Sequence, residues 1–341
     1  MLKSLRNAIA ALALAGFLAP VAASAETLIN GAGATFPYPL YSKWFSEYAK
    51  IDRSVKFNYQ SIGSGGGIKQ ITAQTVDFGA SDKFLSDQEL KAAPGKLLHI
   101  PTVMGAVVVT YNIPGVAKGL KLSPETLTEI FQGKLTSWSD PRLTRDNPGL
   151  KLPNKPIIVV HRSDGSGTTS IFTDYLSSVS PAWAKGVGKG TSVKWPVGLG
   201  GKGNEGVAGQ IRTTPFSIGY VELAYAFENQ LPYAFLKNLA GTFVEPTIAS
   251  TSAAAAGAAK SMPADFRISL VNQPGKNAYP IVGFTWLLVY QDQRDKAKGK
   301  KLVEFLRWEL RQGQSMAAKL LYAPLPANVA KMVGKTVATI K

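Results

Sequence analysis

Three stretches of the chain share one hydrophobic and polar pattern. Each has a short apolar run, then a turn rich in glycine and hydroxyl residues, then apolar positions at helical spacing. The runs at 27–29, 55–59 and 157–160 predict strands, and the positions after residue 37, over 68–72 and over 171–176 predict helices. Alternating strands and helices indicate an α/β fold with mixed sheets.

The turn from Arg162 to Ser170 is the most suggestive of the three. A helix start presents unpaired N–H groups and partial positive charge, so it favours an anion, and Ser166 and Thr168 add hydroxyls. An ordinary helix cap explains the same residues. Thr35 and Ser64 occupy the other two predicted helix starts, at the strand ends where α/β folds bind ligands.

The rest of the pattern suggests two lobes. Strands are predicted at 102–111 and 284–290, a loop at 136–155, and helices at 298–312, 314–321 and 328–333. Proline-containing turns mark two crossings, with hinges near 113–115 and 279–282. We expect one lobe from 26–112 plus 283–341 and another from 116–278, each of ordinary domain size.

The N-terminus predicts export. Lys3 and Arg6 precede an apolar run over 8–17, and residues 23–25 fit a cleavage site, so residues 1–25 are predicted to be a cleaved signal peptide. A membrane anchor is the alternative, but Pro20 interrupts the run. The chain has no cysteine, which argues against a lipid anchor and excludes disulfides and cysteine metal sites. A soluble periplasmic protein is expected.

The formal net charge is +16. A basic surface suits nucleic acid, an anionic membrane or a small anionic ligand. Lysine and arginine are scattered here, and the densest run, at 296–301, is interpreted as a solvated surface. No nucleic-acid partner is predicted.

Motifs for other activities are weak. The GxGxxG pattern at 198–203 follows Pro196 and lacks a full βαβ unit, so we interpret it as a structural turn. Neither Ser64 nor Ser166 lies in GxSxG, no HExxH occurs, and the chain has two histidines, of which His161 is interpreted as structural. A secreted phosphatase-like hydrolase is therefore the weaker alternative, and no catalytic residue, metal or cofactor is predicted.

Together the motifs at 31–37, 63–67, 77–82 and 162–168, with 194–204, resemble the periplasmic phosphate-binding proteins of Pst-type ABC phosphate importers. The resemblance covers the mature chain in order. Family members often carry serine where this chain has Gly65. The resemblance implies a type II periplasmic binding-protein fold whose hinge-linked lobes close on one phosphate. It also implies a monomer that delivers phosphate to membrane permease subunits with a cytoplasmic ATPase.

The resemblance assigns phosphate contacts to Ala34, Thr35, Phe36, Ser64, Asp82, Arg162, Ser166, Gly167 and Thr168, with Asp164 pairing to Arg162. The chemistry of these residues agrees. A dehydrated phosphate needs many donors, which hydroxyls and the amides of Phe36, Ser166, Gly167 and Thr168 can supply without several buried cations. Arg162 would add a planar bidentate contact.

Asp82 is unusual in an anion site. A carboxylate only accepts hydrogen bonds, so Asp82 requires a ligand that still carries a proton. Phosphate does near neutral pH, whereas sulfate does not and would face the carboxylate without a proton between them. Asp82 is therefore predicted to exclude sulfate. A receptor for another tetrahedral oxyanion remains the alternative and would differ in the role of this residue.

Overall fold

The computed structural model describes residues 26–341, so the predicted signal peptide lies outside the described residues. The strands are β1 (Thr27–Gly33), β2 (Val55–Ser61), β3 (Phe78–Ser81), β4 (Leu97–Asn112), β5 (Lys121–Leu122), β6 (Ile158–Arg162), β7 (Leu199–Gly201), β8 (Ser217–Glu222), β9 (Phe235–Lys237), β10 (Phe243–Val244) and β11 (Val282–Tyr290). The helices are α1 (Tyr38–Ile51), α2 (Ser64–Thr72), α3 (Asp87–Ala92), α4 (Pro124–Phe131), α5 (Pro141–Asp146), α6 (Gly167–Val179), α7 (Pro181–Gly186), α8 (Gly203–Thr213), α9 (Leu223–Glu228), α10 (Ile248–Ala258), α11 (Lys296–Trp308), α12 (Gln314–Ala317) and α13 (Ala327–Val337).

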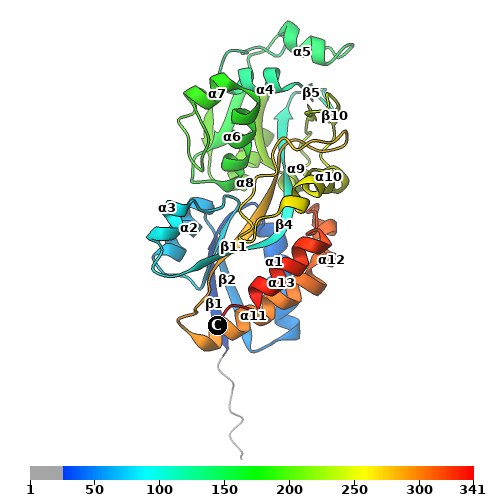
Figure 1. The fold of residues 1–341 in the computed structure, drawn as a ribbon. Coiled ribbons are helices and arrows are strands. Elements are labelled where there is room, and N and C mark those ends of the chain that lie inside the picture. Colours follow the sequence, from blue (N-terminus) through cyan, green and yellow to red (C-terminus); the bar gives the residue numbers. More distant parts are fainter. Residues whose placement is uncertain (1–25) are drawn as a thin grey trace, which may run out of the picture.

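The chain forms two lobes joined by long strands (Figure 1). The main sheet runs β2-β1-β3-β11-β4-β8-β6-β7, and β10-β9-β5 form a small second sheet. Pairing is parallel within β2-β1-β3 and β8-β6-β7, and antiparallel where β11 meets β3 and β4 and where β4 meets β8. The predicted two-lobed α/β fold with mixed strand directions is confirmed. We call the lobe around β1–β3 the first lobe and the lobe around β6–β8 the second lobe.

Strand β4 pairs with strands of both lobes. Its residues 97–106 pair with β11, and its residues 107–112 pair with β8. The change of partner lies between Ala106 and Val107, before the predicted hinge at 113–115. At the second crossing, β11 begins at Val282, opposite Ala106. The domain boundaries and hinges stay predictions, and we propose that the first crossing lies on β4 itself.

All three predicted strand–turn–helix units occur, as β1/α1, β2/α2 and β6/α6. Helix α2 starts earlier than predicted, at Ser64 instead of Ile68. A Cβ at Gly67 would lie 2.6 Å from Gly33 Cα and 2.7 Å from the Ala80 carbonyl oxygen. The glycine run is therefore the first turn of the helix, and it lets α2 pack closely on β1 and β3.

Two other predictions need correction. The predicted loop at 136–155 contains the short helix α5, whose N-cap Asp140 accepts a hydrogen bond from the Arg142 amide. Near the C-terminus, the predicted helix over 298–312 is helix α11 followed by a π-helical turn over Glu309–Gly313. The indole of Trp44 donates to the Gly313 carbonyl at 2.9 Å, so the π turn is anchored to α1.

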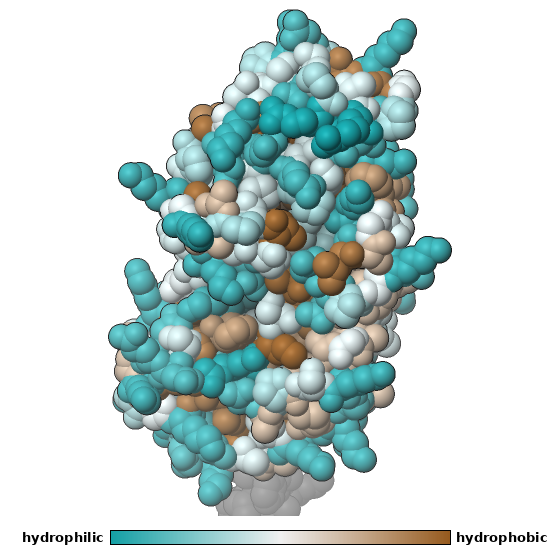
Figure 2. All heavy atoms as spheres, turned by 45° about the horizontal axis from the view of Figure 1, so that its top comes forward, coloured by the Kyte–Doolittle hydropathy of each residue, from teal (hydrophilic) through white to brown (hydrophobic). Residues whose placement is uncertain are grey.

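Figure 2 shows one face covered largely by hydrophilic side chains, with apolar ones gathered near its middle. Among the described residues, no helix combines the length and apolar character needed to span a bilayer.

Candidate anion site between the lobes

The start of α6 in the second lobe lies directly against the first lobe. A Cβ at Gly167 would collide with Ser64 Oγ and Asp82 Oδ2, so glycine permits this approach. Beside it, the amide of Gly65 donates to the carbonyl of Gly165 at 2.8 Å. The structure thus brings together helix starts and strand ends that are far apart in the sequence.

The predicted site residues are enclosed by this arrangement. All nine are buried, namely Ala34, Thr35, Phe36, Ser64, Asp82, Arg162, Ser166, Gly167 and Thr168. The lobes are therefore closed over the site.

Arg162 enters the site from the end of β6 and is held by Asp164. Its Nε lies 2.8 Å from Asp164 Oδ1, and its Nη2 lies 2.6 Å from Asp164 Oδ2. Although burial acts to raise it, the contacts with Arg162 hold the pKa of Asp164 below its ordinary value. The predicted pairing of these residues is present, and it fixes the guanidinium plane.

Asp82 is buried with one carboxylate oxygen unused. Its amide donates to Ser64 Oγ at 3.1 Å, and the Ser64 hydroxyl donates to Oδ2 at 3.4 Å. Oδ1 has no hydrogen-bond partner within residues 26–341. Burial raises the pKa of Asp82 to about 7. The hydroxyls of Thr285 and Ser64 and the positive charge of Arg162 act to lower it. A buried carboxylate with an unpaired oxygen is typical of a ligand site.

The first turn of α6 supplies donors. The amides of Gly167 and Thr168 are the first two of the helix, so no intrahelical carbonyl reaches them. The amide of Ser166, which was predicted as a donor to the anion, instead donates to the Thr191 carbonyl at 2.8 Å. Its side chain caps the helix by accepting from the Thr169 amide at 3.0 Å, which leaves the Ser166 hydroxyl proton free to donate.

On the first lobe, the turn between β1 and α1 contributes Ala34, Thr35 and Phe36. The amide of Ala34 donates to the Ala80 carbonyl at 3.0 Å, and its carbonyl accepts from the Tyr59 hydroxyl at 2.7 Å. Both backbone groups of Ala34 are thus engaged, and they hold the turn that presents Thr35.

The sequence analysis missed Asn204, at the start of α8. Its Nδ2 lies 2.7 Å from Thr35 Oγ1 and 3.2 Å from Thr168 Oγ1, so it contacts one hydroxyl of the first lobe and one of the second. The preceding Gly203 donates its amide to Asp164 Oδ1 at 3.0 Å. The GxGxxG stretch at 198–203, interpreted as a structural turn, therefore also delivers a fourth helix start to the site. The sequence pattern that could have identified this helix start is the strand, glycine turn and helix that also mark the other three units.

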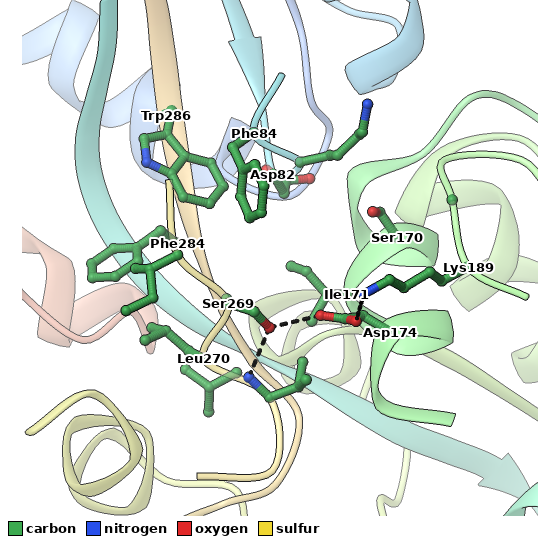
Figure 3. Close-up of a pocket in the computed structure, with 16 residues that line it drawn as sticks. Asp82, Phe84, Ser170, Ile171, Asp174, Lys189, Ser269, Leu270, Phe284 and Trp286 are labelled. Carbon is green, nitrogen blue, oxygen red and sulfur yellow. Dashed lines mark hydrogen bonds and ion pairs between the residues drawn. The ribbon is translucent and has the colours of Figure 1, made fainter. Parts of the chain in front are cut away.

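A cavity of about 270 Å³ lies beside Asp82 (Figure 3). Phe84 and Trp286 line it from the first lobe, and Ile171 and Asp174 line it from α6. Figure 3 shows Ser269 bonded to Asp174, at 2.7 Å, on the side opposite Asp82. The lining of this cavity thus combines apolar side chains with the hydrogen-bonded pair Asp174 and Ser269.

His161 precedes Arg162 in the chain, and its ring makes packing and backbone contacts. Its ring stacks on Trp195 with centroids 4.9 Å apart, and its Nδ1 lies 3.0 Å from the Arg162 carbonyl oxygen. These contacts engage the face of the ring and its Nδ1, which supports the structural interpretation.

Comparisons with known proteins agree with this geometry. Residues 20–309 match the family model for the PBP superfamily domain. The chain is 47% identical over 306 residues to a phosphate-binding protein PstS of Pasteurella multocida, covering 89% of this chain and 88% of that one. It is 41% identical over 337 residues to a PstS of Methanocaldococcus jannaschii, covering 92% and 86% respectively.

Solved structures show the same fold. A phosphate-binding protein from Stenotrophomonas maltophilia aligns with a TM-score of 0.69 at 23% identity, covering 91% of this chain and 94% of that one. A high-affinity periplasmic phosphate-binding protein bound with phosphate aligns with a TM-score of 0.70 at 24% identity, covering 89% and 92%. The chain therefore belongs to the PBP superfamily and, within it, to the PstS family of phosphate-binding proteins.

Proposed function

We propose that this chain binds inorganic phosphate between its lobes and delivers it to an ABC-type phosphate importer. The observation that carries the proposal is the contact of α6 with the first lobe, where Gly167 abuts Ser64 and Asp82. Free helix-start amides, hydroxyls and a buried guanidinium surround one carboxylate there. That combination suits an anion that needs many donors and still carries a proton.

Each predicted residue has a role in this proposal. Thr35, Ser166 and Thr168 donate through hydroxyls, and Ser64 does so once its proton turns from Asp82 Oδ2 to the ligand. Phe36, Gly167 and Thr168 donate through amides. Arg162 supplies the one cation, oriented by Asp164, and Ala34 holds the turn that carries Thr35. Mostly neutral donors disperse the ligand charge at low desolvation cost.

Asp82 would select among tetrahedral anions. Its unpaired Oδ1 can accept the proton of monobasic or dibasic phosphate. Sulfate carries no proton near neutral pH and would place a lone pair against the carboxylate, which costs several kcal/mol in order of magnitude. Another oxyanion that carries a proton would also fit, so arsenate is the natural competitor.

The cellular role follows from the family. We propose that the mature protein acts in the periplasm as a monomer, with permease subunits and a cytoplasmic ATPase as partners. The relatives are named as binding proteins. We propose no catalysis, because Ser166 caps α6, whereas His99 accepts from the Leu85 amide and His161 contacts the Arg162 carbonyl.

Titration calorimetry with phosphate and with sulfate tests the proposal. We expect a phosphate Kd of about 1 μM or tighter and no measurable sulfate binding at the same concentrations. The absence of phosphate binding would overturn the proposed function. Equal affinities for the two anions would leave an oxyanion receptor but remove the role of Asp82. Hydrolysis of p-nitrophenyl phosphate that is lost in Ser166→Ala would instead support the hydrolase.

A further inference from the structure

We infer that Asn204 is a positioning residue that forces the hydroxyls of Thr35 and Thr168 to donate to the ligand. The inference rests on the proposed function, since it states the direction of the hydrogen bonds that two hydroxyls make in the same anion site. Asn204 is fully buried at the start of α8. It was not among the residues predicted to contact phosphate.

The orientation of the Asn204 amide is fixed by the backbone. Its Oδ1 accepts a hydrogen bond from the Glu222 amide at 3.0 Å. A backbone N–H can only donate, so the oxygen of the side-chain amide must face Glu222. The Nδ2 group, which can only donate, therefore faces the two threonines.

The acceptor capacity of both hydroxyls is then filled. Thr35 Oγ1 accepts from Asn204 Nδ2 at 2.7 Å and from the Asn204 amide at 3.2 Å. Thr168 Oγ1 accepts from Asn204 Nδ2 at 3.2 Å and from Arg162 Nη1 at 3.4 Å. A hydroxyl has two lone pairs and one proton, so each of these can only donate outward. A ligand that meets them must be an acceptor, as a phosphate oxygen is.

The same amide also couples ligand binding to closure. Thr35 lies in the first lobe, whereas Thr168 and Asn204 lie in the second. Opening the lobes would break both contacts of Asn204 with Thr35 and free that hydroxyl to rotate. Tyr225 of α9 makes a second contact between the lobes, because its hydroxyl donates to the Thr35 carbonyl at 2.6 Å. The donor set is therefore completed by closure.

Phosphate titration of three variants tests this inference. Asn204→Ala removes the donors and should weaken phosphate binding about tenfold or more. Asn204→Asp keeps the shape but supplies a carboxylate that accepts the threonine protons, so it should bind phosphate more weakly than Asn204→Ala. Asn204→Ser retains one hydroxyl donor and should lose less phosphate affinity than Asn204→Ala does. This variant also keeps the inference testable if Asn204→Ala or Asn204→Asp fails to fold.

A double-mutant cycle separates positioning from a general structural role. In the Thr35→Val/Thr168→Val background, Asn204→Ala should cost little further affinity, because the hydroxyls that it orients are gone. The matched control is Asn238→Ala, which removes a buried asparagine that donates to three carbonyls, those of Gly275, Lys276 and Ala278. It should lower the unfolding temperature and leave phosphate affinity unchanged.

The outcomes are distinct. Wild-type affinity in Asn204→Asp, or fully additive costs in the cycle, would overturn the positioning role while phosphate binding by the wild type stands. Loss of affinity in Asn238→Ala matching that in Asn204→Ala would reduce the effect to general destabilisation and overturn it too. Failure of the wild type to bind phosphate would remove the proposed function first, and this inference with it.

Discussion

The amide of Gly65 and the carbonyl of Gly165 form a hydrogen bond of 2.8 Å between the lobes. A Cβ at Gly65 would lie 3.1 Å from Gly165 Cα, which is tighter than an ordinary van der Waals contact. A small side chain at this position would require its neighbour to shift by a few tenths of an ångström. A larger side chain would hold the two backbones apart.

Gly65→Val is therefore expected to wedge the lobes open. The phosphate Kd should rise about tenfold or more, because closure completes the donor set. Small-angle scattering with saturating phosphate should show a larger radius of gyration than the wild type. Gly209→Val in α8 is the matched control, since a Cβ there meets nothing within 4 Å. An unchanged Kd in Gly65→Val would contradict the close contact as a condition for binding.

Asp82→Asn is expected to reduce discrimination between phosphate and sulfate more than Arg162→Ala does. The asparagine amide can donate to sulfate, so the ratio of the two Kd values should fall by about 100-fold or more. Arg162→Ala removes a cation that attracts both anions, so it should weaken both and leave their ratio closer to that of the wild type. Calorimetry of both variants measures the ratios, and the reverse ordering would show that selectivity lies elsewhere.

Sulfate binding should also depend on pH through Asp82. Burial raises the pKa of Asp82 to about 7. Below that value the carboxyl carries its own proton and becomes a donor, so the clash with sulfate is relieved. Sulfate affinity is expected to increase as the pH falls from about 8 to about 5.5, and the increase should be absent in Asp82→Asn. Identical pH profiles in the two proteins would rule out Asp82 as the titrating group.

Local patterns predicted the strand–turn–helix units well. Residues 55–59 alternate clearly and 157–160 form a short β-branched apolar run, so both strands follow from the local hydrophobic pattern. The start of α2 was misplaced because glycines at 65–67 are poor helix formers by propensity. The close packing of Gly67 on Gly33 and Ala80, which overrides that propensity, is a tertiary contact.

The contacts of the candidate site also divide into those that local sequence predicts and those that depend on the fold. Arg162 and Asp164 are two residues apart, so their pairing was accessible from sequence. The contact of Asn204 with Thr35 joins opposite lobes across the closed cleft, and no local pattern encodes it. The engaged amide of Ser166 depends likewise on Thr191, a residue in the loop after α7. Sequence spacing predicted which helix starts carry donors, and the fold decides which donors remain free.

The last prediction concerns His99 and acid stability. His99 is buried on β4, and its Nε2 accepts from the Leu85 amide at 2.9 Å. Burial lowers its pKa to about 4, helped by the charge of Arg267. The unfolded chain takes up this proton near pH 6.5, so the contribution to stability is complete above that value. It is lost as the pH falls toward about 4, by up to about 3 kcal/mol.

In His99→Gln the amide oxygen can accept from Leu85 but does not titrate. The difference in the free energy of unfolding between variant and wild type, measured by urea denaturation, should therefore shift in favour of the variant as the pH falls from about 7 to about 4.5. Burial raises the pKa values of Glu222 and Glu309, and those carboxyls titrate with the opposite sign. They are present in both proteins, so their effect cancels in the difference. A difference that stays constant with pH would show that His99 is protonated alike in the folded and unfolded chains.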